Sequence, residues 1–297
     1  MTLEVWGMSC VGVAVLVAGL IFVHPRFRAA AGADRVIVLG PVFEAVALAM
    51  FAMEHFTAAR VLAQIVPKWL PGHLFWTYLV GIALMAAALS FIAWRCVRWS
   101  AALLALLFLI IVATIDLPNL PANLHERLFW ILTVRELCFA SGAMVLAGSV
   151  WAPGSPVGTA LMRVGRGNVG AVMVFYGIEH FVSSRTVPGV PLEKLTPAWV
   201  PAPALLAYFV GTTLALTGIA FFAQRTIRVA AASCGAVLLA LTALFYVPIF
   251  VTEIHTELAV EGINYVGDTL LFAATILLAG FGARPATDRR GAGGGTL

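Results

Sequence analysis

Long runs of apolar residues, separated by short polar stretches, make up most of the chain. A helix needs roughly 20 mostly apolar residues to cross a bilayer core of about 30 Å, and many of these runs have that length. Charges, Pro and Gly bound the runs and predict nine membrane-spanning helices, at residues 5–23, 36–56, 73–94, 99–115, 127–150, 164–183, 203–223, 229–250 and 263–283. The sixth has only twelve uncharged residues between Arg166 and Glu179, so it must bury polar groups in order to cross.

The apolar runs fall into two halves that repeat one another. MEHFTAAR at 53–60 matches IEHFVSSR at 178–185, an offset of 125, and VPKWLP at 66–71 matches TPAWVP at 196–201, an offset of 130. Isolated residues keep the second offset as far as His125 and His255. Repetition at a fixed offset indicates a duplicated structural unit. We therefore predict an all-α, polytopic transmembrane bundle: a leading helix and cytoplasmic loop (1–35), two parallel four-helix units (36–150 and 151–283) and a disordered, Gly-rich tail (284–297).

Composition supports a membrane protein, and the distribution of basic residues predicts its orientation in the membrane. Hydrophobic residues make up 62% of the chain and charged residues only 11%, which excludes a water-soluble globular domain. The net charge of +4 does not indicate nucleic-acid binding, because the basic residues are scattered between apolar runs. With nine spans, twelve Lys and Arg residues fall on one side and five on the other. The positive-inside rule then predicts a bacterial-type cytoplasmic (inner) membrane protein with its N-terminus outside and its C-terminus in the cytoplasm.

A few ionisable side chains recur in the outer half of the predicted helices. Each costs at least about 2.5–3.5 kcal/mol at mid-helix, so each needs a partner or a purpose. They are Glu54, His55, His125 and Glu136 in the first unit, and Glu179, His180, His255 and Asp268 in the second. A carboxylate beside a His can hold a proton, bind a quinone carbonyl or ligate a metal, or the pair is simply hydrated at headgroup level. Because adjacent helical residues point about 100° apart, we predict no metal site.

Two further charges, Glu44 and Arg135, lie within predicted spans of the first unit only. Ion pairing inside the bundle, which would include Glu136, is one interpretation, and a proton or substrate path is the other. In the outer loops, Trp69 and Trp199 are flanked by prolines. Either they anchor the loops at the membrane interface, or the loops form lids over the Glu-His pairs.

The motifs of both halves resemble those of DoxX-like membrane proteins. The first half carries EHF at 54–56, PKWLP at 67–71 and YLVG at 78–81; the second carries EHF at 179–181, PAWVP at 197–201 and YFVG at 208–211. The resemblance covers about residues 36–283 and implies a four-helix membrane unit named after a subunit of a thiosulfate:quinone oxidoreductase.

From this resemblance we expect a membrane component of a redox or quinone-linked system, at most a membrane subunit of an oxidoreductase. The cofactor stays open, with a quinone as the candidate, and the expected partners are the lipid bilayer and a soluble or membrane redox protein. Two alternatives remain from the residues themselves: a small-solute permease built from parallel repeats, and a scaffold subunit without its own chemistry. Hydrolase, ATPase and zinc-peptidase motifs do not occur in the sequence.

Overall fold

The computed structural model describes residues 2–190, 192–223 and 225–282. The tail predicted at 284–297 lies outside the described residues. Within them the protein is all-helical: no strand forms, and the one isolated β-bridge joins Thr186 and Leu195. The prediction of an all-α bundle is therefore confirmed.

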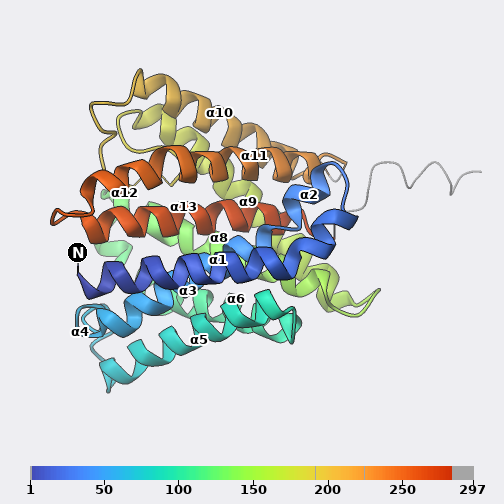
Figure 1. Cartoon of the computed structure of the whole chain (residues 1–297), viewed down its shortest axis with the longest axis horizontal. Coiled ribbons are helices and arrows are strands. Elements are labelled where there is room, and N and C mark those ends of the chain that lie inside the picture. The colour runs from blue at the N-terminus through green and yellow to red at the C-terminus, as the bar shows by residue number, and fades with distance from the viewer. Residues whose placement is uncertain (1, 191, 224, 283–297) are drawn as a thin grey trace, which may run out of the picture.

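Nine long helices lie side by side along one direction (Figure 1); this count refers to the described ranges. They are α1 (Leu3–Ala29), α3 (Gly40–Thr57), α5 (His73–Ala93), α6 (Val97–Ile111), α8 (Arg127–Ser149), α9 (Pro156–Val182), α10 (Pro203–Ala220), α11 (Ile227–Leu241) and α13 (Ala259–Ala279). Short elements complete them: α2 (Ala33–Ile37), α4 (Ala59–Leu62), α7 (Leu117–Asn119), α12 (Val247–Glu253), the 3-10 turn η2 (Pro121–Asn123) and two π-helical segments, η1 (Val112–Asp116) and η3 (Thr242–Tyr246).

Eight of these helical stretches in the described residues are long and apolar enough to cross a membrane. The exception is α9, the predicted sixth span, whose 27 residues have the length but not the hydropathy. Several of its polar side chains find partners in the protein. Arg166 donates hydrogen bonds to the carbonyl oxygens of Ala279 and Phe281, and Asn168 donates to Leu137 O and Ser141 Oγ. Low hydropathy in α9 thus reflects polar contacts with neighbouring helices.

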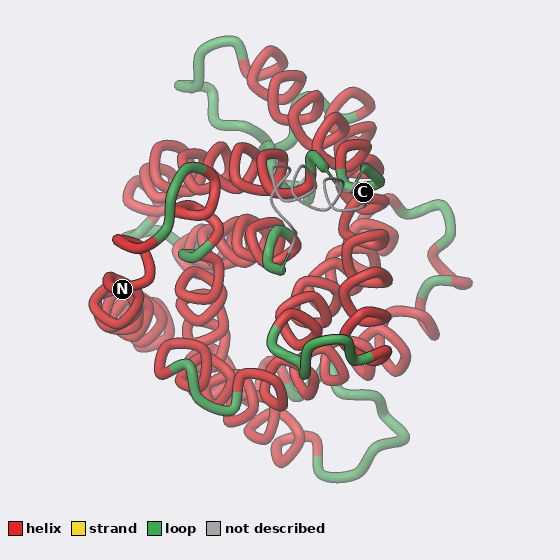
Figure 2. Tube along the Cα trace, turned by 90° about the vertical axis from the view of Figure 1, so that its right-hand side faces the viewer, coloured by secondary structure: helices red, strands yellow, loops and turns green. Residues whose placement is uncertain are grey.

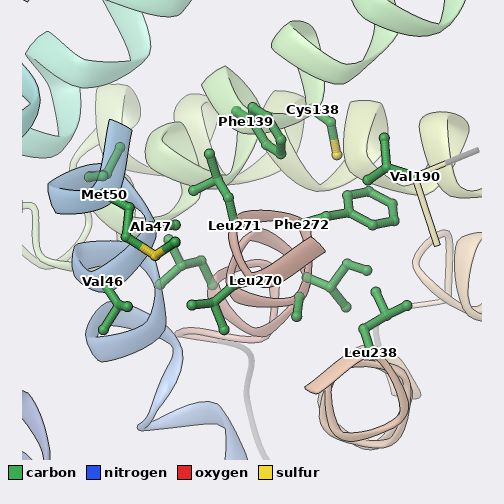
Figure 3. Packing of buried hydrophobic residues seen from close by; sticks show 14 of the residues in the cluster. Val46, Ala47, Met50, Cys138, Phe139, Val190, Leu238, Leu270, Leu271 and Phe272 are labelled. Carbon is green, nitrogen blue, oxygen red and sulfur yellow. The ribbon is translucent and has the colours of Figure 1, made fainter. Parts of the chain in front are cut away.

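Helices α8 and α13 form the centre of the bundle. Contacts between neighbours run in the order α3, α5, α6, α8, α9, α10, α11, α13 and back to α3, so eight helices close a ring (Figure 2). Because α8 also contacts α13, these two helices join across the ring. Of the 21 residues of α13, 17 are buried. Its Leu270, Leu271 and Phe272 lie among side chains from α3, α8 and α11 (Figure 3).

Helix α1 packs outside this ring, against α3. Its buried residues are spaced three or four apart, as expected for a helix with one protein-facing stripe, and the other faces expose large apolar side chains. Glycines let the two helices approach closely: a Cβ at Gly12 would lie 2.9 Å from Met50 Cγ, and one at Gly19 would lie 2.5 Å from Val42 Cγ1. The leading helix is therefore part of the packed bundle.

Helix boundaries in the second half follow those in the first at the offsets found in the sequence. The ends of α3 and α9 differ by an offset of 125, and the starts of α5 and α10 by an offset of 130. The starts of α6, η1 and α7 match those of α11, η3 and α12 at the same second offset. π-Helical segments are rare and often accompany functional sites. Here each precedes a proline, Pro118 or Pro248, whose missing N–H weakens the α-helical hydrogen-bond ladder.

Contact between α9 and α10 depends on glycines at matched positions. A Cβ at Gly218 would lie 2.5 Å from the carbonyl oxygen of Gly170, a backbone atom that cannot rotate away. By contrast, a Cβ at Gly167, on the same helix as Gly170, meets no described atom within 4 Å. Small residues of this kind permit close helix packing in membranes.

We predict that Gly218→Leu lowers the free energy of unfolding by about 1–3 kcal/mol, the usual effect of overpacking. Gly167→Leu is the matched control and should leave stability nearly unchanged. Thermal unfolding of the purified protein in detergent measures both. Equal effects of the two substitutions would contradict this account of the α9–α10 contact.

Candidate functional site

A cleft lies at the end of the bundle where α8 and α13 begin, lined by Leu128 of the first half and by residues of the second half. We call it the interface cleft; it has a volume of about 450 Å³. Its walls come from the start of α8, from the segment before α10 and from α13: Leu128, Leu192, Glu193, Lys194, Val260, Glu261, Asn264, Tyr265 and Asp268. Five of the nine lining side chains are ionisable, which is unusual for a site among membrane-spanning helices.

One guanidinium lies beside the cleft and joins the two halves. Arg135 Nη1 donates a hydrogen bond to Asp268 Oδ2 at 2.7 Å, and its Nη2 donates to Glu136 Oε1 at 2.9 Å. All three side chains are largely buried. At 1.5 Å per residue, they lie about 12–14 Å along the helix axes from the start of α8 and α13. Glu136 and Asp268 hold corresponding positions in the two sequence repeats once a further insertion of two residues in the second half is counted, and they share this single cation.

Further polar contacts surround the cleft. Lys194 Nζ pairs with Glu253 at 2.9 Å and with Glu261 at 3.4 Å, which ties the segment before α10 to α12 and α13. Glu54 Oε1 accepts a hydrogen bond from Asn264 Nδ2 at 2.9 Å, which links α3 to α13. Glu179 pairs with Arg127 at 2.6 Å, linking the end of α9 to the start of α8. Glu54 and Glu179, the carboxylates of the two predicted Glu-His pairs, thus each bind a partner from the other half of the chain.

His180 is held in place by a segment that packs into the interior of the bundle. We call this segment, residues 186–190 and 192–195, the strap. Within it Val187 and Val190 are fully buried, and Val190 belongs to the same apolar cluster as Leu238 and Phe272 (Figure 3). His180 Nδ1 donates to the Tyr176 carbonyl at 2.6 Å, and His180 Nε2 accepts from the Gly189 N–H at 2.8 Å. Both ring nitrogens of His180 are therefore satisfied.

The other predicted histidines differ from His180. His55 Nδ1 donates to the Phe51 carbonyl at 2.8 Å, but its Nε2 has no hydrogen bond within the described residues. His125 and His255 are exposed in the loops before α8 and α13, and no hydrogen bond to a described residue joins them to the carboxylates. The structure therefore does not bring His125 or His255 into the arrangement predicted for either unit.

Glu44 lies apart from the other charges. Its side chain is fully buried in α3, and neither carboxylate oxygen has a hydrogen-bond partner among the described residues. Cys138 of α8 lies close enough to interact with it electrostatically. The predicted pairing inside the bundle thus exists for Arg135 and Glu136, but Glu44 is not part of it.

The two loop tryptophans remain near the surface. Trp69 is 70% exposed, and Trp199 is 54% exposed and lies beside Phe245 with ring centroids 6.4 Å apart. This placement suits a residue at the membrane interface. The strap, rather than the Trp199 loop, contacts the ring of His180.

Several residues near the cleft do not stand out in the sequence. Lys194 and Arg127 lie at the ends of apolar runs, where charges are ordinary, and Asn264 carries no charge. Asp116 ends η1 close enough to Arg135 and Glu136 for electrostatic interaction, and its Oδ2 is buried without a hydrogen-bond partner in the described residues. An acid at the end of an otherwise uncharged run is the signal that could have identified it. No group of three or more His, Cys, Asp or Glu side chains in the described ranges could hold a metal ion.

Comparison with known proteins places one part of the chain in context. Residues 44–117 are similar to a family described as a domain of unknown function, DUF8561. This match covers about a quarter of the chain, from α3 into α7. No curated protein and no solved structure matches the chain. The resemblance to DoxX-like proteins therefore stays a prediction.

Removing the shared cation should destabilise the fold more than removing one of its partners. We predict that Arg135→Gln lowers the free energy of unfolding by about 3–5 kcal/mol, because it leaves two buried carboxylates uncompensated. Asp268→Asn should cost only about 1–2 kcal/mol, since Arg135 keeps Glu136. Unfolding in mixed detergent micelles measures both, with Arg185→Gln, at a site outside this network, as the control. A larger effect for Asp268→Asn would contradict the shared-cation arrangement.

The buried carboxyl group of Glu44 should lower the stability of the protein, because it has no hydrogen-bond partner among the described residues. Replacing a buried polar group that lacks partners by an apolar one of similar size is neutral or stabilising, so we predict that Glu44→Leu leaves the thermal midpoint unchanged or raises it. Leu48, one helical turn away and also fully buried, provides the opposite control: Leu48→Ala should lower stability by about 2–5 kcal/mol. Marked destabilisation by Glu44→Leu would mean that this carboxyl makes stabilising contacts.

Proposed function

We propose that this protein is a multi-pass membrane protein made of two parallel four-helix repeats, and that it acts as a small-solute permease through the interface cleft. The observation that carries the proposal is the Arg135–Asp268 ion pair, which joins the central helices of the two halves beside the cleft. Transporters built from repeats bind their solutes at the repeat interface, often with buried charges. The matched helix boundaries of the two halves support the same architecture.

The charges around the cleft favour a cationic solute. Among the described residues, the cations there include Arg127, Arg135 and Lys194. The carboxylates include Glu54, Glu136, Glu179, Glu193, Glu253, Glu261 and Asp268. In a site of low dielectric constant, a surplus of carboxylates is stabilised by bound cations or protons. A small organic cation meets this requirement and also fits the polar hydrogen-bonding walls.

We infer that the cleft faces outward from a cytoplasmic membrane of bacterial type. Arginines concentrate at the opposite end of the bundle, where Arg26 lies over Trp94, Arg98 over Trp99 and Arg166 on the end of α13. By the positive-inside rule this basic end is cytoplasmic, which leaves the N-terminus of α1 outside.

The quinone-linked role implied by the DoxX-like resemblance is a separate prediction. It requires that the purified protein carry a quinone, and that loss of Arg135 or Asp268 reduce the quinone content. A scaffold subunit, the third alternative, predicts neither a quinone nor solute binding. Lipid extraction with quinone analysis therefore separates these roles from a permease.

Transport in liposomes tests the permease. We predict that the protein in phosphatidylcholine liposomes takes up at least one of three radiolabelled cations, ethanolamine, putrescine or choline, with saturable kinetics. Losing one ionic contact removes about 1.5–3 kcal/mol of binding, so Asp268→Asn should weaken the apparent affinity about tenfold or more.

Arg185→Gln is the matched control and should transport like the wild type. Folding of each variant is checked by size-exclusion chromatography before reconstitution. Absence of saturable uptake of all three cations by folded wild-type protein would contradict the proposal, as would unchanged uptake by Asp268→Asn.

A further inference from the structure

A narrow groove lies where α1, α3 and α5 meet at the basic end of the bundle; we call it the α1 groove. Its wall from α1 is one stripe of residues spaced three or four apart: Gly19, Phe22, Val23 and Arg26. The segment that begins α3 forms its floor, and residues 91–94 at the end of α5 form the opposite wall. Three helices thus enclose a volume of about 110 Å³.

An arginine stacked on a tryptophan closes the α1 groove at the basic end. The guanidinium carbon of Arg26 lies 3.9 Å from the centroid of the Trp94 ring. Trp94 follows α5 in the left-handed backbone conformation, with a φ of 51°, a place that glycine or asparagine usually takes at the end of a helix. A tryptophan in this conformation brings a large aromatic face against the cation.

The hydrogen-bond donors of this pair have no acceptor in the described part of the chain. The Arg26 guanidinium makes no hydrogen bond and no ion pair there, and contact with a ring face leaves its N–H groups without an acceptor. The indole N–H of Trp94 likewise donates to no described residue, and no carboxylate lines the groove. These donors suit an anion with several acceptor oxygens.

Away from this pair the α1 groove is apolar. Apart from Arg26 and Trp94, every residue that lines it has an apolar side chain or is glycine. The 27 residues of α1 extend about 40 Å, further than a bilayer core of about 30 Å, so the last turn, with Arg26, lies at headgroup level. Phe22, one turn earlier, is 64% exposed. The groove thus offers polar donors at headgroup level and apolar walls at the level of the acyl chains.

We propose that the α1 groove binds one anionic phospholipid. Its phosphate oxygens accept hydrogen bonds from the Arg26 guanidinium and the Trp94 indole, and an acyl chain packs along Phe22. Phosphatidylglycerol has this chemistry, whereas the ammonium of phosphatidylcholine would lie among the arginines of this end, which include Arg28 and Arg95. The site is separate from the interface cleft, so the proposal does not depend on the permease.

Native mass spectrometry of the delipidated full-length protein in non-ionic detergent counts the lipids that bind it. We expect one phosphatidylglycerol to bind about tenfold or more tightly than phosphatidylcholine. Arg26→Gln removes charge-assisted hydrogen bonds and should weaken phosphatidylglycerol binding about tenfold or more. Arg28→Gln is the matched control: it removes the same charge from the same helical turn, outside the groove, and should weaken binding by less than about threefold.

A second pair of variants tests the α1 groove without a change of charge, and decides the matter if Arg26→Gln does not fold. Ala93 lines the groove and is exposed, so Ala93→Phe fills it from the outside. Ala86→Phe, at an exposed position of α5 outside the groove, is the control. Without lipid, both variants should unfold at the temperature of the wild type, and only Ala93→Phe should lose phosphatidylglycerol binding, by about tenfold or more.

Four results would overturn the inference. They are equal binding of phosphatidylcholine and phosphatidylglycerol, equal effects of Arg26→Gln and Arg28→Gln, wild-type binding by Ala93→Phe, and displacement of the lipid by inorganic phosphate. In the last case the arginine would recognise an anion alone, and the apolar walls would have no part in binding.

Discussion

The contact between the two halves of the protein depends on the guanidinium group of Arg135. Helices α8 and α13 contact each other across the ring, and Arg135 binds their corresponding acids, Glu136 and Asp268. Removal of any of these charges from water is unfavourable, and only a close ion pair offsets it. A duplicated unit would place two like charges at this contact, and the arginine is what makes their proximity tolerable. The interface therefore has a fixed register and a polar cleft beside it.

Around this centre, close packing requires small residues rather than large apolar ones. Lipid competes for apolar side chains, so helices associate where backbones approach closely, as at Gly170 and Gly218 or at Gly81 beside His55. Gly81, like Gly211 in the second half, also packs against a histidine of the neighbouring helix. It sets the histidine ring against the neighbouring helix and leaves one ring nitrogen directed to other partners. Helix packing and site chemistry thus share the same residues.

Much of the fold was predictable because the length of each apolar run and the repetition of motifs can be read directly from the sequence. Helix number, order and the corresponding positions of the two halves follow from runs of residues and from offsets of 125 and 130. The site was less predictable because its contacts join distant residues: Glu54 with Asn264, Glu179 with Arg127, Arg135 with Asp268. The repeat suggested one site inside each unit, whereas the ion pairs join the units. No spacing rule indicates that α13 lies beside α3 and α8.

One difference between the halves follows from a short insertion in the sequence. Five residues inserted after the second Glu-His pair let the strap reach the interior, where backbone groups satisfy His180 and Tyr246. The first half has neither the insertion nor the tyrosine, and an acid stands at the equivalent position. A buried carboxylate oxygen without a partner persists only where something offsets its desolvation. In the second half a tyrosine hydroxyl is satisfied by the strap, whereas Asp116 of the first half has Arg135 and Glu136 as charged neighbours.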